Sequence, residues 1–312
     1  MKKYYWALLL LFFLSCTNEI IVDLPEQESY PVVFSTITPF TLPYPKTNNI
    51  QVFESNELSE EDTIVFDEAK IFVYENNVLL GNATYNNDSY SYPNNFTPQT
   101  GNNYSIRIIS KAYDTLTSST TIPQVVEIEN LVVNPIAYID MDDWAVSEVQ
   151  ITFHDPKNEV NYYEVCLSNK GINYDSRDFF ELRTDNFSIT SESYYPSVLN
   201  FDNNFPDFLL FKDDKFDGEK FVLNVYYSPP QSWKAGQNHI SEQQLLVHLR
   251  NISREYYLHK TTLLHQIQNR SEDILYGTGE PVNVYSNIKN GRGVFAGFNS
   301  DIMQVTIKDT IY

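Results

Sequence analysis

The sequence has few cysteines, few glycines, little positive charge and only one long hydrophobic run. Of its two cysteines, Cys16 ends the hydrophobic run and Cys166 lies in a predicted strand, so no disulfide framework is expected. Cys166 is expected to be a small buried residue. With 21 Lys and Arg against 41 Asp and Glu, the formal net charge is −20. This charge argues against nucleic acid and anionic lipid as partners, because both require basic patches.

The hydrophobic run lies at the N-terminus. Lys2 and Lys3 precede eleven apolar residues, 4–14, which as a helix span only about 16 Å at ~1.5 Å per residue. A membrane span needs roughly 30 Å, so the run is typical of a signal peptide. Ser15 and Cys16 follow, a pattern typical of a bacterial lipoprotein signal, in which Cys16 is diacylated and becomes the N-terminus. The two residues before Ser15 are bulkier than usual, and an ordinary secretory signal cut nearby is the alternative.

Removal of residues 1–15 leaves 19 basic and 41 acidic residues and a net charge near −22. Residues 16–29 are acidic and lack a long apolar face, so they are predicted to be a tether between lipid and fold. The remaining length allows two domains. Apolar content of 42% and aromatic content of 15%, with 23 Tyr and 20 Phe, predict a folded and β-rich chain.

Beyond the tether the chain consists of short alternating runs separated by turn residues. Predicted strands lie at 30–38, 49–55, 68–76, 78–84, 103–110 and 115–122. Ile71 and Val73 alternate with polar residues, as in half-buried strands, and Asn76-Asn77 favours a tight hairpin. Residues 30–123 are therefore predicted to form an immunoglobulin-like or transthyretin-like β-sandwich.

Residues 124–312 are predicted to form a larger antiparallel β domain. Its predicted strands lie at 125–133, 146–155, 161–169, 207–214, 220–228 and 243–252. A single helical period covers 253–269, with Ser253 as a plausible N-cap, and this helix is expected to cover one face or end of the sheet. Alternation over 280–288 predicts a further strand, packed on the sheet of this second domain.

The acidic turn at 212–219 is the sharpest local motif. Its carboxylates could supply oxygens to calcium, and they are Asp213, Asp214, Asp217 and Glu219. Their spacing does not fit an EF-hand, and a solvated acidic β-turn between two strands is the favoured interpretation. No metal or other cofactor is therefore predicted.

Catalytic motifs are absent from the sequence: it has no G-x-S-x-G elbow, no zinc-type histidine spacing, and no strand-to-helix context for the glycines at 291–297. The protein is therefore not expected to be an enzyme, and a hydrolase is the least favoured hypothesis. Four aromatic residues could form stacking platforms for a ligand, although core positions are the commoner role: Trp144, Trp233, Tyr194 and Tyr195.

Four blocks occur in a characteristic order: Cys16 with its acidic tether and Val32-Val33, LLFKDDKFDGEKF (209–221), SREYYLHKTTLLHQ (253–266) and EPVNVYSNIKNGRGVFAG (280–297). With these blocks the chain resembles, from end to end, the Bacteroidota outer-membrane lipoproteins that share domain of unknown function 4249. The resemblance implies a two-part β-rich fold and a possible accessory role beside TonB-dependent outer-membrane receptors. It implies no catalytic residues. No dense acidic run of the kind associated with export to the outer face follows Cys16. The sequence therefore leaves two locations as alternatives, the periplasmic face and the cell-surface face of the outer membrane.

Two functions follow as hypotheses. The favoured one is a non-enzymatic accessory lipoprotein that docks on, or delivers ligand to, a TonB-dependent transporter. The alternative is a surface glycan-binding module. A broad apolar patch with a polar rim would favour protein docking, and an exposed aromatic strip on one β face would favour glycan binding.

Overall fold

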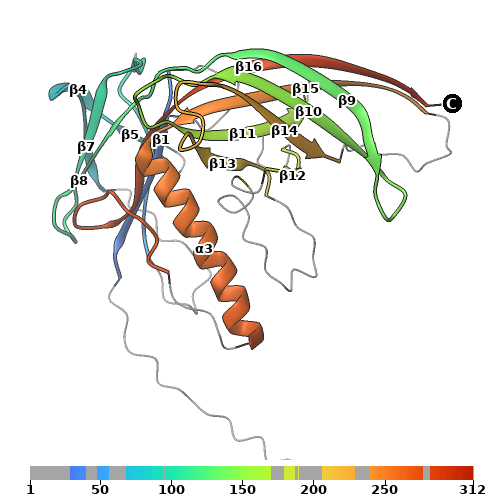
Figure 1. Ribbon diagram of the computed structural model, residues 1–312. Coiled ribbons are helices and arrows are strands. Elements are labelled where there is room, and N and C mark those ends of the chain that lie inside the picture. The colour runs from blue at the N-terminus through green and yellow to red at the C-terminus, as the bar shows by residue number, and fades with distance from the viewer. Residues whose placement is uncertain are drawn as a thin grey trace, which may run out of the picture.

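The computed structural model describes residues 29–39, 48–55, 68–86, 88–94, 96–169, 179–186, 189, 206–228, 239–276 and 282–311. Within these ranges the chain forms three β-sheets and one α-helix, α3 (Arg254–Tyr276). A long sheet arches across the molecule, and α3 projects from its underside (Figure 1). The predicted fold class, mainly antiparallel β with one helix, is confirmed.

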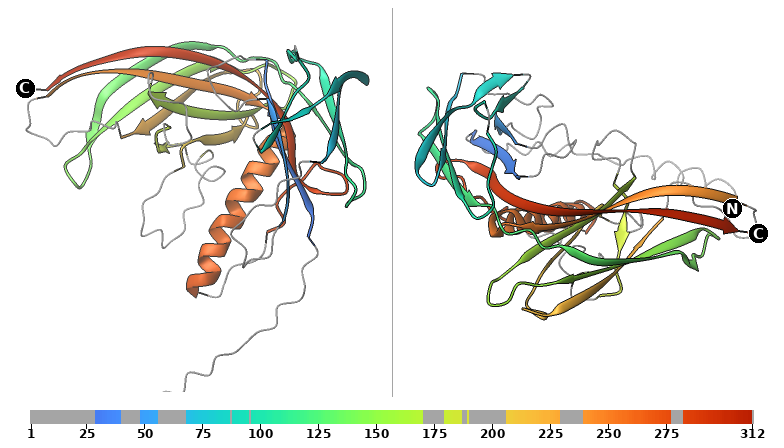
Figure 2. Two further views of the ribbon diagram at one scale, coloured as in Figure 1. Left: turned by 180° about the vertical axis from the view of Figure 1, so that it is seen from behind. Right: turned by 90° about the horizontal axis from the view of Figure 1, so that it is seen from above.

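The largest sheet has eight strands. In spatial order they are β13 (Leu209–Lys212), β11 (Tyr162–Asn169), β15 (His239–Ile252), β16 (Arg292–Ile311), β1 (Pro31–Ile37), β2 (Asn49–Glu54), β6 (Ser89–Ser91) and β5 (Thr84–Asn86). Strands β15 and β16 pair along their length, from His239 opposite Ile311 to Ile252 opposite Phe298. All neighbours are antiparallel except β1 and β16, which run parallel. Figure 2 shows the long β15–β16 ribbon running through the molecule.

Two four-stranded sheets pack on the eight-stranded sheet. One has the order β12 (Leu182–Arg183), β14 (Lys220–Tyr227), β10 (Ala145–His154) and β9 (Ile128–Ile139). The other has the order β4 (Val78–Asn82), β3 (Lys70–Glu75), β7 (Asn103–Ile109) and β8 (Leu116–Thr121). Successive side chains of a strand point to opposite faces of its sheet, so one face can pack against a second sheet. Strand β1 shows this pattern, because every second residue is buried.

The sheets enclose two main hydrophobic cores. The first core is built from residues between Val33 and Ile122 together with Ile288 and Phe295 from near the end of the chain, and the second core begins at Val126. Strand β16 serves both, because Phe295 packs in the first core and Ile307 in the second. The eight-stranded sheet therefore continues across the predicted domain boundary.

The hairpin and the helix follow their local signals. Asn76 and Asn77 have φ of 48° and 68°, as a tight turn between β3 and β4 requires. Helix α3 begins after Ser253, whose hydroxyl accepts from Tyr256 N at 3.4 Å, and it continues seven residues beyond the predicted end at residue 269. The apolar stripe ends near Ile267, but Arg270, Glu272 and Leu275 are good helix formers and no Gly or Pro occurs before Gly277. In the part of the chain that the structure describes, no helix combines the length and hydrophobicity needed to cross a membrane.

The strand predicted at 280–288 is wrong. Residues 282–288 join no sheet, and their backbone groups bond to side chains instead of a ladder: Ser118 Oγ donates to Asn287 O at 3.0 Å, and Tyr285 N donates to Thr262 Oγ1 at 2.9 Å. The expected contact with the second-domain sheet is also wrong, because Asn287 lies against β8 of the first part.

Candidate functional site

The loop between β13 and β14 brings together part of the predicted acidic cluster. The loop leaves the eight-stranded sheet for a four-stranded sheet, and Asp155 directly follows β10 in that second sheet. One carboxylate oxygen from each of Asp155, Asp213 and Asp217 lies within 4.8 Å of the other two. Backbone N–H groups hold two of them: Asp217 accepts from Asn158 at 2.8 Å, and Asp213 accepts from Asn161 at 2.7 Å.

Burial sets the electrostatics of this cluster. Burial raises the pKa of Asp155, hydrogen bonds from the Tyr163 hydroxyl and the Gly218 amide lower it, and the charges of Asp213 and Asp217 raise it. Carboxylate oxygens are the ligand type that calcium prefers. Protein donors already occupy both oxygens of Asp155 and one oxygen of each partner. These bonds account for the geometry by tying the loop to the end of β10.

The other two predicted ligands lie elsewhere. Asp214 pairs with Lys212 at the surface, and the Glu219 side chain is exposed while its carbonyl accepts from Asp155 N at 3.0 Å. The solvated-turn interpretation is wrong for Asp213, which is only 3% exposed. Asp155 was not predicted, because it follows a different strand far away in the sequence.

A second titratable cluster, absent from the sequence-based expectations, lies beneath α3. Glu164 on β11 is fully buried and accepts hydrogen bonds from Arg250 on β15 and Lys260 on α3. Burial alone would raise the pKa of Glu164, but Lys260 and Arg250 outweigh it and lower the pKa to about 2. The Lys260 ammonium also lies 3.8 Å from the ring centroid of Phe208. The cluster therefore holds α3 against the sheet.

Cys166 and His248 face each other on neighbouring strands, and both are buried. Burial raises the pKa of the Cys166 thiol to about 12 and lowers the pKa of His248 to about 3. At pH 7 the thiol therefore stays protonated and the imidazole stays neutral, so Cys166 is not an activated nucleophile. The prediction that Cys166 is a small buried residue is confirmed.

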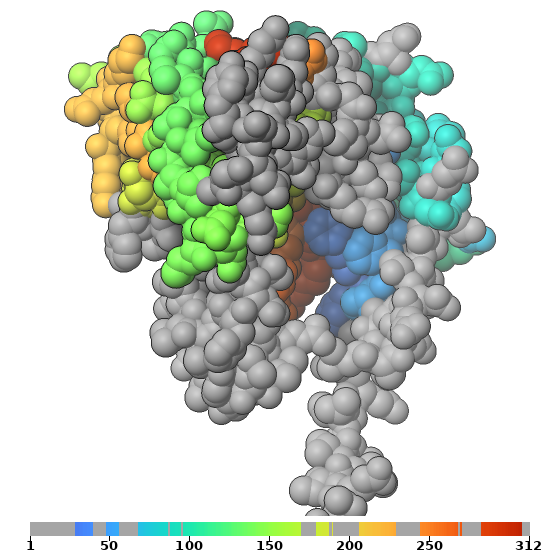
Figure 3. Space-filling view, turned by 90° about the vertical axis from the view of Figure 1, so that its right-hand side faces the viewer, coloured from blue at the N-terminus to red at the C-terminus, as the bar shows by residue number. Residues whose placement is uncertain are grey.

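Of the four predicted aromatic residues, Trp144 lies within the described ranges; Trp233, Tyr194 and Tyr195 lie outside them. Trp144 stands at the end of the β9–β10 hairpin and is 38% exposed. Three apolar neighbours on the same hairpin are also exposed: Tyr138 (41%), Ile139 (41%) and Met141 (103%). The hairpin projects beyond the sheets in Figure 1 and stands at the surface in Figure 3. We call these four residues the hairpin tip.

Three aspartates, Asp140, Asp142 and Asp143, lie in the same turn as the hairpin tip. Asp140 Oδ1 accepts from Asp142 N at 3.0 Å and from Trp144 N at 2.8 Å, which fixes the turn. Asp143 has a φ of 65°, a conformation that Asp tolerates better than most residues. The tip is therefore an ordered turn that exposes apolar side chains between aspartates.

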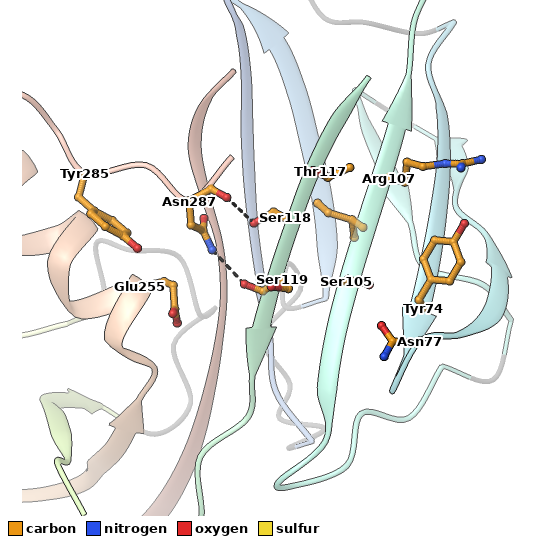
Figure 4. A pocket seen from close by; sticks show the side chains of 11 residues that line it. Tyr74, Asn77, Ser105, Arg107, Thr117, Ser118, Ser119, Glu255, Tyr285 and Asn287 are labelled. Atoms are coloured by element: carbon orange, nitrogen blue, oxygen red, sulfur yellow. Dashed lines mark hydrogen bonds between the residues drawn. The ribbon is translucent and has the colours of Figure 1, made fainter. Parts of the chain in front are cut away.

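An open polar groove of about 610 Å³ lies on the face of the β4-β3-β7-β8 sheet that is turned away from the core (Figure 4). Ser105 on β7 and Ser119 on β8 form its floor, with Tyr74 on β3 on one side and Tyr285 on the other. Its remaining polar lining consists of Asn77, Arg107, Thr117, Ser118, Glu255 and Asn287. The sequence alone did not indicate this groove, because its lining comes from three strands, α3 and the segment before β16.

Comparisons with solved structures and with curated proteins add little about activity. A crystal structure of a protein from Corynebacterium diphtheriae, described as membrane anchored, shares 11% identity with the chain at a TM-score of 0.19. The match covers 73% of this chain and 55% of that one, and so low a TM-score carries no argument. No curated protein matches the chain.

The comparison with protein families is informative. The family described as Domain of unknown function (DUF4249) matches residues 17–302, nearly the whole length of the chain. This match confirms the family that the four sequence blocks indicated, domain of unknown function 4249. The chain therefore belongs to the DUF4249 family.

Proposed function

We propose that this protein is a lipid-anchored, non-enzymatic accessory protein of the outer membrane that docks on a TonB-dependent transporter. The observation that carries the proposal is the hairpin tip, where Tyr138, Ile139, Met141 and Trp144 are exposed on one turn that also carries aspartates. Trp, Tyr and Met are enriched in protein interfaces, and an apolar centre with a polar rim is their usual composition. Exposed apolar groups of this kind gain free energy when a partner covers them.

The N-terminal sequence supports anchoring. Two acyl chains on Cys16 would hold the protein stably at a membrane, whereas a single chain binds only weakly. A fully extended tether over 16–29 reaches roughly 45 Å at ~3.3 Å per residue. The folded part would then stay close enough to the membrane to meet a transporter embedded in it.

The titratable groups of the described chain support the absence of catalysis in this proposal. The Cys166 thiol is buried with its pKa raised to about 12, and both oxygens of Asp155 are occupied by protein donors. The Glu164 carboxylate is fully buried beneath α3. These groups stabilise the fold and are poorly placed to reach a substrate.

A pull-down from native outer membranes tests the proposal. We expect the wild-type lipoprotein to co-purify with a TonB-dependent transporter, and we expect Met141→Asp combined with Trp144→Asp to reduce the recovered transporter at least tenfold. Val160→Asp is the matched control, since Val160 is an exposed apolar residue (66%) away from the hairpin tip. Absence of any transporter in the wild-type sample, or equal recovery with the double variant, would contradict the proposal.

Surface glycan binding is the second candidate function. It is favoured by one observation, the polar groove flanked by Tyr74 and Tyr285. The groove and the hairpin tip belong to different sheets, so separate variants can test the two functions.

A further inference from the structure

We propose that the groove over the β4-β3-β7-β8 sheet is a binding site for a neutral oligosaccharide. The groove combines an open trough of about 610 Å³, hydroxyl groups on its floor, and a tyrosine on each side. Its volume lies within the range of ordinary small-ligand sites, roughly 300–1,000 Å³. The inference rests on the second candidate function, glycan binding, and deepens it by naming the class of ligand; it does not depend on docking on a transporter.

The strand register creates the floor of the groove. Ser105 pairs with Tyr74 on one side and with Ser119 on the other, so one row across three strands reads Tyr, Ser, Ser. Since neighbouring strands are about 4.8 Å apart, the row extends roughly 10 Å from β3 to β8. Two small side chains next to one large ring leave a trough beside that ring.

The hydroxyl groups of this row are available to a ligand. Within the described chain, the side-chain hydroxyls of Tyr74, Ser105 and Ser119 make no hydrogen bond to another protein group. Such groups donate and accept, which suits a ligand that carries many hydroxyls of its own. The row therefore offers direct hydrogen bonds along its length.

The far wall of the groove is rigid. Asn287 donates to Ser119 O at 3.2 Å and to Phe295 O at 2.7 Å, and its Oδ1 accepts from Phe295 N at 3.0 Å. Figure 4 shows Tyr285 beside Asn287, across the groove from Tyr74. Tyr285 is itself held through its backbone, because its amide donates to Thr262 Oγ1 at 2.9 Å and its carbonyl lies 2.7 Å from His259 Nδ1. A wall fixed before binding lowers the entropy cost of holding a ligand.

The charges of the lining select the ligand class. Arg107 and Glu255 contribute one positive and one negative charge, so the groove as a whole favours neither an anion nor a cation. The Arg107 guanidinium lies 5.0 Å from the ring centroid of Phe72, which orients it at the surface. The protein's net charge of −20 further disfavours acidic polysaccharides. Tyrosine rings that pack on the C–H faces of sugar rings, with hydroxyl, amide and guanidinium groups between them, fit a neutral polyhydroxyl chain.

The proposal can be tested by calorimetry on the full mature lipoprotein in a detergent without sugar headgroups. The ligands are neutral linear hexasaccharides of glucose, mannose, xylose and N-acetylglucosamine, each titrated separately. We expect saturable binding of at least one hexasaccharide. Ser119→Gln, which fills the floor, should weaken binding at least tenfold, and Tyr74→Ala should weaken it roughly threefold to tenfold through lost ring contact.

Thr121→Gln is the matched control, because Thr121 is an exposed residue two positions further along β8 and lies outside the groove lining. It should leave the dissociation constant unchanged. Binding that survives Ser119→Gln would place the sugar site elsewhere and overturn the proposal. Failure of all four hexasaccharides to bind, or preferential binding of a charged oligosaccharide or a peptide in the groove, would also overturn it. None of these results depends on the hairpin tip, so they test glycan binding without testing docking on a transporter.

Discussion

Neutralising Glu164 should sharply destabilise the protein. The carboxylate is fully buried and is the shared partner of Arg250 and Lys260, so Glu164→Gln leaves two largely buried cations with a neutral amide. Breaking a buried pair from one side typically costs about 3–5 kcal/mol. The lowered pKa of Glu164, about 2 against a usual 4.5, gives a similar figure, on the order of 3 kcal/mol at ~1.36 kcal/mol per pKa unit.

The same pKa gives the sign of the pH dependence. Because folding lowers the pKa of Glu164, the stability that the ionised Glu164 contributes is fully present above pH 4.5 and is lost as the pH falls toward about 2. Wild-type protein should therefore lose stability steeply across this window. The Glu164→Gln variant should show a correspondingly shallower loss, since it lacks the titrating group.

Urea unfolding followed by far-UV circular dichroism measures both effects. Glu68→Gln is the control, because it removes a salt bridge to Lys111 in which both side chains are largely exposed, and it should change stability little. A second variant, Glu164→Leu with Arg250→Met and Lys260→Met, should recover much of the lost stability, since no buried charge stays unpaired. If Glu164→Gln costs less than about 1 kcal/mol, the cluster does not hold α3 as described.

Three further perturbations follow from the structure. Asp155→Ala should lower the free energy of unfolding in urea by about 2–3 kcal/mol, because it leaves the buried Tyr163 hydroxyl without its acceptor. A decrease below half that value would show that water replaces the carboxylate. Gly293→Ala should lower the free energy of unfolding by at least about 3 kcal/mol, since Gly293 has a φ of 99° and an added Cβ would lie 2.0 Å from Val33 O. An unchanged melting temperature would show that β1 and β16 are not paired as described. Dialysis against EDTA should leave the melting temperature unchanged, because backbone and side-chain donors already hold the acidic loop; a fall of several degrees would reveal a bound cation.

Local signals predicted the local structure well. Alternation at Ile71 and Val73 identified a half-buried strand, and both residues are fully buried. The Asn76-Asn77 pair identified its turn because these residues tolerate positive φ. Each of these signals depends only on neighbours in the sequence.

Long-range placement could not be predicted in the same way. The parallel pairing of β1 with β16 joins the two ends of the chain, and alternation says nothing about which strands pair. Residues 282–288 alternate like a strand, but the side chains of Ser118 and Thr262 make the backbone hydrogen bonds that a neighbouring strand would supply. The polar groove and the approach of Asp155 to the acidic loop have the same origin, since both bring together residues from separate strands.

Site-specific photo-crosslinking in intact cells can show whether the hairpin tip docks on a transporter. A photoreactive amino acid at Met141, the most exposed residue of the tip, should crosslink to a TonB-dependent transporter in the outer-membrane fraction. The same amino acid at Val160 should give no such product. A transporter crosslink of equal yield from both positions, or none from Met141 in membrane-anchored protein, would show that the hairpin tip is not the docking surface.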